Sequence, residues 1–478
     1  MMTGTYDPGE TKIRPGVYRR YTTPEKKSVA EAINGVFAIP IQADFGPVGT
    51  VQVHTKAETV EDMYGSGGTV KGVLNLFDNG ASKVYVYRLG SEGTKGILEL
   101  MDDQGEKAVT LETKYPTKLV FSLTLKQPLS SSSKKEVTIY QGSSLKEKFT
   151  YETGSDENEV DAFIREINQK SSIFTAVKAD GEKNSLAQVS QKESTAGTNP
   201  TVVTGNYEEA FGAFEAYTWN ALVADTTDTA VHALLKAYMQ RMKSNGCAGI
   251  CVVGESAEVD FAERMSHAKE FNSEAFVYVG SGFVNKNGEK IDGYEAITVI
   301  AGIIGSCPSN QSIVHSVIAD AVEPLEILSK EKYIQAIENG MLMLSQGPEG
   351  KVWFDSGINT LNVLEENQDP GWKKIRRTKT RFELFDRLHR TISPVIGKIN
   401  CDSDGIANVI KLAKDVLDAM TREGKLMDGA DIYEDPQEPH GPEDVHFIVA
   451  ATDLDSLEKV YLNYQFNFSA EIISRNPE

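Results

Sequence analysis

Between residues 201 and 348 the sequence alternates short β-rich runs with longer segments of helical spacing. "AGICVVG" and "AFVYVG" are typical of buried strands. The segment "TAVHALLKAYMQRMK" places one apolar residue set on a single helical face: Val231, Leu234, Leu235, Tyr238, Met239 and Met242. Strands that alternate with helices predict a mostly parallel sheet with helices on both faces. This part of the chain is therefore predicted to form an α/β domain.

The composition changes on both sides of that domain. Residues 1–25 are polar and rich in proline, which predicts an N-terminal linking arm; in it, "RPGVYRRYT" is an extended segment without a local strand partner. Residues 26–90 supply the N-terminal part of the α/β core, and residues 91–200, rich in Ser, Thr, Lys and Glu, a β-rich insertion domain. Residues 349–478 predict an α+β C-terminal domain with two long helices and the terminal strand "LEKVYLNYQFNFSAEII". The expected fold class is a multidomain α/β protein with extended terminal arms.

Charge and hydropathy exclude several kinds of partner. The 478 residues carry a formal net charge of −20, which argues against nucleic acid as a bulk partner because phosphates need a basic surface. No apolar run reaches the roughly 18 residues of a membrane-spanning helix, so no direct membrane insertion is expected. The first residues lack the apolar stretch of a secretory signal, and four cysteines make a poor disulfide framework, so synthesis in a reducing cytoplasm is expected.

A glycine cluster, "GSGGTVKG", precedes the stretch "LFDNGASKVYVYRLG" and raises the possibility of a phosphate-binding loop. A P-loop needs a Lys-Ser/Thr pair at a fixed distance, and a dinucleotide fingerprint needs G-x-G-x-x-G; the cluster has neither. Glycines at a helix start also occur for steric reasons alone. The steric interpretation is favoured, and no cofactor is expected.

A catalytic alternative rests on Asp225, Asp228 and His232, which follow a predicted strand of the parallel sheet. Ligands of such sheets bind at the carboxyl ends of the strands. The chain lacks the G-x-S-x-G elbow that would place a nucleophile there. We therefore expect Asp228 to cap a helix and His232 to lie on the helix surface, and no enzyme activity. An α/β-fold hydrolase with an unrecognised nucleophile stays as the alternative.

Two charged segments are further candidates for binding. His440 and His446 lie among acidic residues, where a metal site is possible but a solvated acidic loop is favoured. A basic stretch stands out in the acidic chain and is predicted to be a protein-facing surface that meets copies of the chain or a charged partner: Lys373, Lys374, Arg376, Arg377, Lys379 and Arg381.

Several motifs occur together in a characteristic order. They are "RPGVY", "DFGPVG" and "LFDNGASKVYVYRL", followed downstream by "GINTL", "WKKIRRTKTRFELFDRLHRTI", "VIGKIN" and "LEKVYLNYQF". Through them the chain resembles the tail sheath proteins of contractile phages, phage-tail-like bacteriocins and contractile injection systems. The resemblance covers about residues 1–90 and 200–478.

The resemblance implies a structural subunit with a subtilisin-like but non-catalytic core. Family sheaths polymerise as stacked six-fold rings around an inner tube, and their contraction drives the tube through a cell envelope. The implied partners are further copies of the chain, the inner tail tube protein, and baseplate and tail terminator proteins. The implied location is a phage tail or tail-like particle, made in the cytoplasm of a bacterial host.

The resemblance also implies two sets of contact residues. Terminal arms that complete a sheet in adjacent subunits would use Ile13, Pro15, Val17, Tyr18, Val460, Leu462, Tyr464, Phe466 and Phe468. The C-terminal domain attaches to the tube in this family, and the amphipathic helix in "IANVIKLAKDVLDAMTREGKL" is available for it. Its apolar face comprises Ile406, Val409, Ile410, Leu412, Ala413, Val416, Leu417 and Met420. Its polar face, predicted to meet the tube, comprises Lys411, Lys414, Asp415, Asp418, Arg422 and Lys425.

Overall fold

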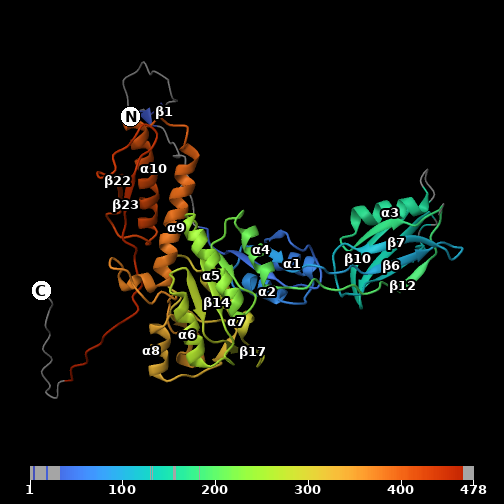
Figure 1. The fold of residues 1–478 in the computed structure, drawn as a ribbon, viewed down its shortest axis with the longest axis horizontal. Coiled ribbons are helices and arrows are strands. Elements are labelled where there is room, and N and C mark those ends of the chain that lie inside the picture. Colours follow the sequence, from blue (N-terminus) through green and yellow to red (C-terminus); the bar gives the residue numbers. More distant parts are fainter. Residues whose placement is uncertain are drawn as a thin grey trace.

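The computed structural model describes residues 33–129, 131, 133–153, 158–181 and 184–466, and the backbone of β1 (Gly4–Thr5) and β2 (Tyr18–Arg19). An α/β core lies in the middle of an elongated molecule. The residues of the expected insertion lie at one end and a helical C-terminal part at the other (Figure 1). Among the described residues, no helix is both long and apolar enough to cross a membrane.

The core is built on a seven-stranded sheet of order β19-β15-β14-β13-β3-β5-β4. Every pairing in it is parallel except that of the edge strand β4 with β5. The strands are β3 (Val36–Ile41), β4 (Val51–His54), β5 (Lys83–Arg88), β13 (Ala221–Val223), β14 (Ile250–Gly254), β15 (Phe276–Val279) and β19 (Met341–Leu342). The predicted mostly parallel sheet is confirmed.

Helices cover both faces of this sheet, and each face has its own hydrophobic cluster. One face packs against α1 (Ala57–Tyr64), α2 (Val70–Asp78) and α7 (Gly293–Ser306). The other packs against α4 (Thr204–Phe214), α5 (Thr229–Ser244), α6 (Phe261–Phe271) and α8 (Lys330–Glu338). The strands are apolar on both sides because both sides are buried.

The insertion has two small sheets, of order β10-β9-β8-β12 and β11-β7-β6, and one helix. Its elements are β6 (Ile97–Met101), β7 (Lys107–Thr113), β8 (Ser122–Lys126), β9 (Lys134–Gln141), β10 (Ser144–Glu152), α3 (Glu159–Lys170), β11 (Phe174–Lys178) and β12 (Val189–Glu193). These elements enclose a third hydrophobic cluster, to which the core contributes one side chain, Phe45.

The C-terminal part consists of α9 (Ile375–Ile392), α10 (Ser403–Arg422) and a hairpin of β22 (Asp431–Glu434) and β23 (Phe447–Ala450). The first residue of α9, Ile375, belongs to a core cluster, whereas Leu384 packs with α10. Therefore α9 joins the two parts. Short strands complete the described chain: β16 (Phe283–Asn285), β17 (Lys290–Ile291), β18 (Ala321–Pro324), β20 (Leu344–Gln346) and β21 (Val352–Phe354).

Several predicted elements are wrong in detail. The pattern of "TVEDMYGSGGTVKGVLNLFDNG" predicts one helix before Asn79, but the glycine cluster divides it into two, α1 and α2. "PLEIL" is predicted as a strand, but the strand there, β18, ends at Pro324; "KVWFDSGINTL" is predicted as a strand pair but supplies one strand, β21, which pairs with β20. Local patterns predict only three strands in the insertion, β8, β9 and β10; they give no sign of β6, β7, β11 and β12, nor of α4 in the core.

Both terminal segments also differ from expectation. "RPGVYRRYT" has a partner within the chain, because β2 pairs in parallel with β1 (Tyr18 opposite Gly4). The predicted terminal strand is not formed in its described part, since residues 454–466 belong to no strand. The boundaries of the five expected segments stay predictions.

One arginine fixes the insertion against the core. Arg88, the last residue of β5, is fully buried. Its guanidinium donates to the carbonyls of Ala43 (3.0 Å) and Gly46 (2.6 Å) in the core and of Pro116 (3.0 Å) in the insertion. Nearby, the Phe45 ring lies 5.4 Å from that of Tyr115, centroid to centroid. Arg88, which lies in the motif "LFDNGASKVYVYRL", thus joins the core and the insertion.

We predict that Arg88→Met destabilises the protein by about 3 kcal/mol, because it leaves buried carbonyl oxygens without a donor. The midpoint of urea-induced unfolding measures the loss. Arg241→Met is the control, since Arg241 forms an exposed pair with Glu215 that contributes less than about 1 kcal/mol. Equal midpoints for the two variants would contradict the role assigned to Arg88.

Candidate functional site

The carboxyl edge of the parallel sheet is where a catalytic site would lie. Asp225 follows β13 there and is 1% exposed. Its Oδ2 accepts a hydrogen bond of 2.6 Å from the Thr69 hydroxyl, and Oδ1 has no hydrogen-bond partner among the described residues. Burial raises the pKa of Asp225 to about 6. The Asp225 carboxyl group thus bonds to another part of the core and is shielded from solvent.

The two neighbours of Asp225 in the catalytic hypothesis have different roles. Asp228 caps α5, accepting a hydrogen bond from the Ala230 amide (2.9 Å), as expected. His232 was expected on the helix surface, and this is wrong: it is 3% exposed because it faces inward toward Phe271. Its Nε2 lies 3.2 Å from the carbonyl oxygen of Thr226, and burial lowers its pKa. No described hydrogen bond joins His232 to Asp225.

The glycine cluster allows the start of α2 to approach this edge closely. A Cβ atom on Gly68, whose φ is +67°, would lie 2.2 Å from the Gln42 carbonyl oxygen. A Cβ atom on Gly67 would lie 2.0 Å from a carboxylate oxygen of Asp44. The Thr69 amide donates to the Gln42 carbonyl (2.9 Å). Close packing, against a backbone carbonyl at Gly68 and against a carboxylate side chain at Gly67, accounts for these two glycines.

Other polar side chains at this edge bind one another. Glu255, which follows β14, accepts hydrogen bonds from the Tyr278 hydroxyl and from His267 (2.8 Å). Ser256 donates to Asp292 (2.6 Å), the residue before α7. Within the part of the chain that the structure describes, no group of three His, Cys, Asp or Glu side chains could hold a metal ion. The edge therefore shows mutual polar bonds and no arranged nucleophile and base.

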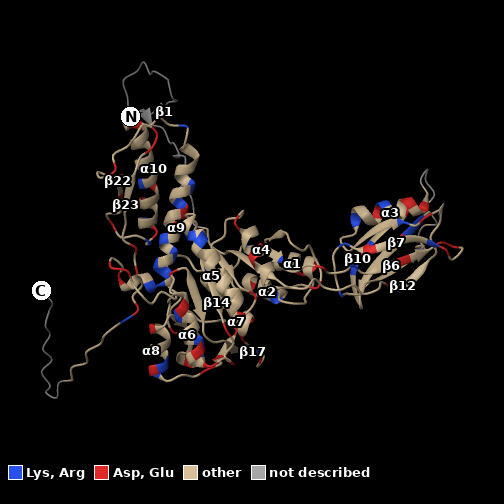
Figure 2. Cartoon of the chain, viewed as in Figure 1, with Lys and Arg blue, Asp and Glu red and all other residues tan. Residues whose placement is uncertain are grey.

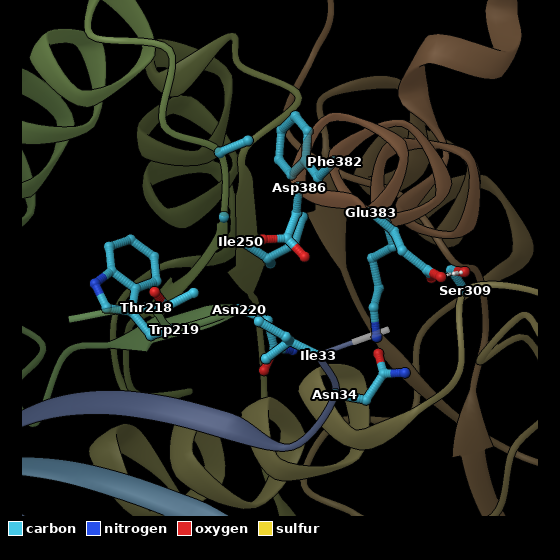
Figure 3. A pocket seen from close by; sticks show the side chains of 13 residues that line it. Ile33, Asn34, Thr218, Trp219, Asn220, Ile250, Ser309, Phe382, Glu383 and Asp386 are labelled. Carbon is cyan, nitrogen blue, oxygen red and sulfur yellow. Dashed lines mark hydrogen bonds between the residues drawn. The ribbon is translucent and has the colours of Figure 1, made fainter. Parts of the chain in front are cut away.

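A cavity lies at the opposite edge, where α9 crosses the amino ends of the strands. Figure 3 shows Asn220 and Ile250 on the sheet side and Glu383 and Asp386 on the α9 side. The cavity measures about 80 Å³, and Glu383 accepts a 2.5 Å hydrogen bond from Ser309 beside it. Its size admits a few water molecules, and it lies away from the edge at which parallel sheets bind ligands.

The predicted basic surface is wrong as an external surface. Lys and Arg gather along α9 (Figure 2). Those of the basic stretch are buried or half-buried. Arg376 and Lys379 are each 9% exposed. Lys379 Nζ donates to the carbonyl oxygens of Ile304 (2.5 Å) and Cys307 at the end of α7. Burial lowers the pKa of Lys379 to about 8. The basic stretch therefore forms contacts within the chain, between α9 and the core.

The predicted tube-facing set lies on α10, with one exception. Lys411, Lys414, Asp418 and Arg422 are exposed and Asp415 is half-buried, while most of the predicted apolar face is buried. Lys414 pairs with Asp431 of β22 (2.8 Å).

Lys425 does not belong to this face. It lies beyond the end of α10, is 5% exposed, and its Nζ lies 2.7 Å from Glu383 and 2.6 Å from Glu423. Arg387 joins the same cluster at 2.6 Å from Glu383. The assignment of Lys425 to the exposed face is wrong, because the chain turns inward where the helix ends.

The arm residues are only partly described. Ile13, Pro15, Val17 and Phe468 lie outside the described residues, and of Tyr18 only the backbone is described. The other four are highly exposed: Val460 (67%), Leu462 (69%), Tyr464 (71%) and Phe466 (81%). Large apolar side chains along one extended segment, all facing solvent, indicate a surface that another molecule covers.

The comparisons with known proteins point to one class. Residues 201–360 match the family model of the phage tail sheath protein central domain. The resemblance of the chain to contractile tail sheath proteins is confirmed.

Particular relatives extend the similarity to nearly the whole chain. The phage-like element PBSX protein XkdK of Bacillus subtilis is 20% identical, over 98% of this chain and 100% of XkdK. A sheath tail protein from Desulfitobacterium hafniense has a similar structure (TM-score 0.69, 15% identity, 92% of this chain and 100% of that one). So does a chain of the anti-feeding prophage helical sheath in the contracted state (TM-score 0.53, 10% identity, 95% and 99%). The shared fold is that of mixed α/β, multidomain sheath proteins.

A pH-dependent prediction follows from Asp225. Its pKa of about 6, above the ordinary 3.8, means that the folded state holds the proton more tightly than the unfolded state. Stability is therefore lost as the pH rises from about 3.8 to about 6 and is constant above that range. The stability of Asp225→Asn relative to wild type should therefore increase between pH 5 and pH 7.5 by about 1.5 kcal/mol, roughly half of the full effect of about 3 kcal/mol. Urea unfolding at both pH values measures it. A pH-independent difference would contradict the buried, raised-pKa carboxyl.

A second prediction separates Lys425 from the exposed lysines. Lys425→Met should destabilise the protein by about 3 kcal/mol, because it leaves two carboxylates with one cation fewer in a buried cluster. Lys411→Met, the matched change on the exposed face, should alter stability by less than about 0.5 kcal/mol. If both variants have the same midpoint of thermal unfolding, the buried ion pairs of Lys425 do not stabilise the fold and the prediction fails.

Proposed function

We propose that this protein is the structural subunit of a contractile tail sheath, which polymerises as stacked six-fold rings around an inner tube. On contraction the sheath drives the tube through the envelope of a target cell. The observation that carries the proposal is the match of residues 201–360 to the family model of the sheath central domain. The fold of the chain is also similar to that of an anti-feeding prophage sheath in the contracted state. A neighbour in a six-fold symmetrised baseplate of the anti-feeding prophage supports the ring symmetry.

The α/β core serves in this proposal as a scaffold, related in fold to subtilisin but without catalysis. In support, the polar side chains at the carboxyl edge of its sheet bind one another, and Asp225 is sealed beneath Thr69. The hydrolase alternative would need a serine or cysteine positioned by a base at this edge. No described contact there favours it.

The terminal arms link the subunits. A subunit in a contracting sheath must slide past its neighbours while staying attached, and main-chain hydrogen bonds of an added strand survive such reorientation. The described arm, residues 459–466, is extended, exposed and belongs to no strand. The hairpin β22–β23 is a two-stranded sheet whose outer edges have no partner strand among the described residues, so it offers acceptors for arms from adjacent copies.

The inner tube would meet the exposed polar face of α10, now reduced to Lys411, Lys414, Asp415, Asp418 and Arg422. The buried apolar face of α10 packs on α9, so the polar face is presented on a fixed support. Baseplate and terminator proteins would cap the two ends of the polymer in a phage tail or tail-like particle made in the cytoplasm of a bacterial host.

Deleting residues 1–20 tests the linking role. We expect the truncated subunit to keep the melting temperature of the full chain, because the described core clusters contain no residue before Ile33. It should fail to form rods under conditions in which the full chain forms them, as seen by negative-stain electron microscopy. A truncation after residue 458 should behave in the same way. Normal rods from either truncated chain would refute the arm mechanism.

A further inference from the structure

The C-terminal arm leaves the molecule from a segment that lies against the first turns of α9. We call residues 453–458 the arm root. Asp453 receives two arginines: Arg377 Nη2 lies 2.6 Å from its Oδ1 and Arg381 Nε lies 3.5 Å from its Oδ2. Bonding to Asp453 is the largest cause that raises the pKa of Arg377. The beginning of the arm root is thus held by charge.

The rest of the arm root is held in the same manner. Lys374 lies 3.7 Å from Asp455 and is also bonded to Glu458. Arg376 Nη1 donates to the Ser456 hydroxyl (2.7 Å). We call the four cations Lys374, Arg376, Arg377 and Arg381 the basic seat. They are four of the six residues of the predicted basic stretch, to which the proposed function assigns no role.

Apolar packing and main-chain bonds contribute little beyond the start of the arm root. Its last described backbone-to-backbone hydrogen bond runs from the Leu454 amide to the Lys425 carbonyl (2.9 Å). Leu457, its large apolar residue in the second half, is 84% exposed. The side chains of Lys374 and Glu458 are 23% and 19% exposed, so water reaches their contact.

Open space lies on the other side of the arm root. A cleft of about 370 Å³ separates Ser456, Leu457 and Glu458 from the loop at Gln311–His315. The root therefore has an ionic contact on one flank and room to move on the other.

We propose that the basic seat and the arm root form an ionic hinge that sets the direction in which the linking arm leaves the subunit and yields when the arm is pulled. The contact of Lys374 with Glu458 joins partly hydrated side chains and is replaced by water when it breaks, so the outer half of the root separates before the more deeply buried contact at Asp453. An apolar seat would resist until its buried area was lost at once. The hinge rests on the proposed function, because it acts on an arm that links two copies.

The test uses chymotrypsin on the full-length subunit before assembly. Cleavage after Leu457, within the arm root, requires the held residues on either side, Ser456 and Glu458, to leave the basic seat, so its rate follows the population of released roots. Lys374→Glu replaces two attractions with repulsions and should speed this cleavage about five- to ten-fold. The charge swap Lys374→Glu with Glu458→Lys should restore most of the protection. Mass spectrometry of the fragments identifies the cut.

Lys373→Glu is the matched control. It changes charge one residue away, at a side chain that donates to the Asn362 carbonyl oxygen (2.9 Å) and not to the arm root. It should leave the cleavage rate unchanged. Wild-type cleavage in Lys374→Glu, or equal acceleration in Lys373→Glu, would overturn the hinge. The melting temperatures of all variants show whether a faster cleavage reports release of the root or general unfolding. If the charge swap does not restore protection, the hinge is also overturned.

Electron microscopy of assembled rods separates the hinge from the proposed function. If the hinge is correct, Lys374→Glu rods form but show a broader distribution of ring-to-ring spacing than wild-type rods. If wild-type chains form no rods, the sheath function fails, while the cleavage experiment on the subunit still decides whether the basic seat holds the root. Lys374→Glu rods with wild-type regularity would refute control of arm direction by the seat.

Discussion

The junction between the core and α9 is held by buried polar side chains, and the C-terminal part depends on it. Lys379, which is 9% exposed, donates to the carbonyl oxygens that α7 leaves unpaired at its end. Thr380 donates to the Ser309 carbonyl (3.0 Å), and Arg381 lies 3.4 Å from Glu274. A cation at a helix C-terminus is favoured by the helix dipole. Because each bond needs one fixed register of α9, the helix transmits the position of the core to α10, the hairpin and the arm root.

The edges of the sheets show where chain-to-chain pairing is avoided. β10, at the edge of the insertion, carries Lys146 and Lys148 and has a register irregularity between Leu145 and Glu147, both of which discourage strand addition by another chain. Arg88 holds this insertion to the core. The arm has the opposite character, since its apolar side chains are uncovered from Leu457 to Phe466. In the proposed sheath, this contrast favours chain-to-chain contacts through the C-terminal arm over contacts through the edge of the insertion.

Local patterns predicted the core well because its signals are local. The apolar face of α5, the strands β14 and β15 and the cap at Asp228 each follow from residues within one element. The exposed polar face of α10 was predicted for the same reason. The basic stretch and Lys425 were misassigned because their partners lie far along the chain, at Asp453 and Glu383, and no periodicity reveals such pairing. His232 was misassigned because a polar residue on an amphipathic helix is ordinarily exposed, and here it faces Phe271.

In the proposed sheath subunit, the same long-range pairing lets an α/β architecture serve as a scaffold. A doubly wound sheet leaves a crevice at the carboxyl ends of its strands, and enzymes keep polar groups free there. In this chain Thr69 covers Asp225, Glu255 is occupied by Tyr278 and His267, and Asp292 by Ser256. Each of these hydrogen bonds makes the edge more rigid, and it occupies a polar group that could otherwise bind a substrate. A subunit that bears mechanical load needs a core that keeps its shape, and its adaptable contacts can lie at the arm root, where charged side chains meet water.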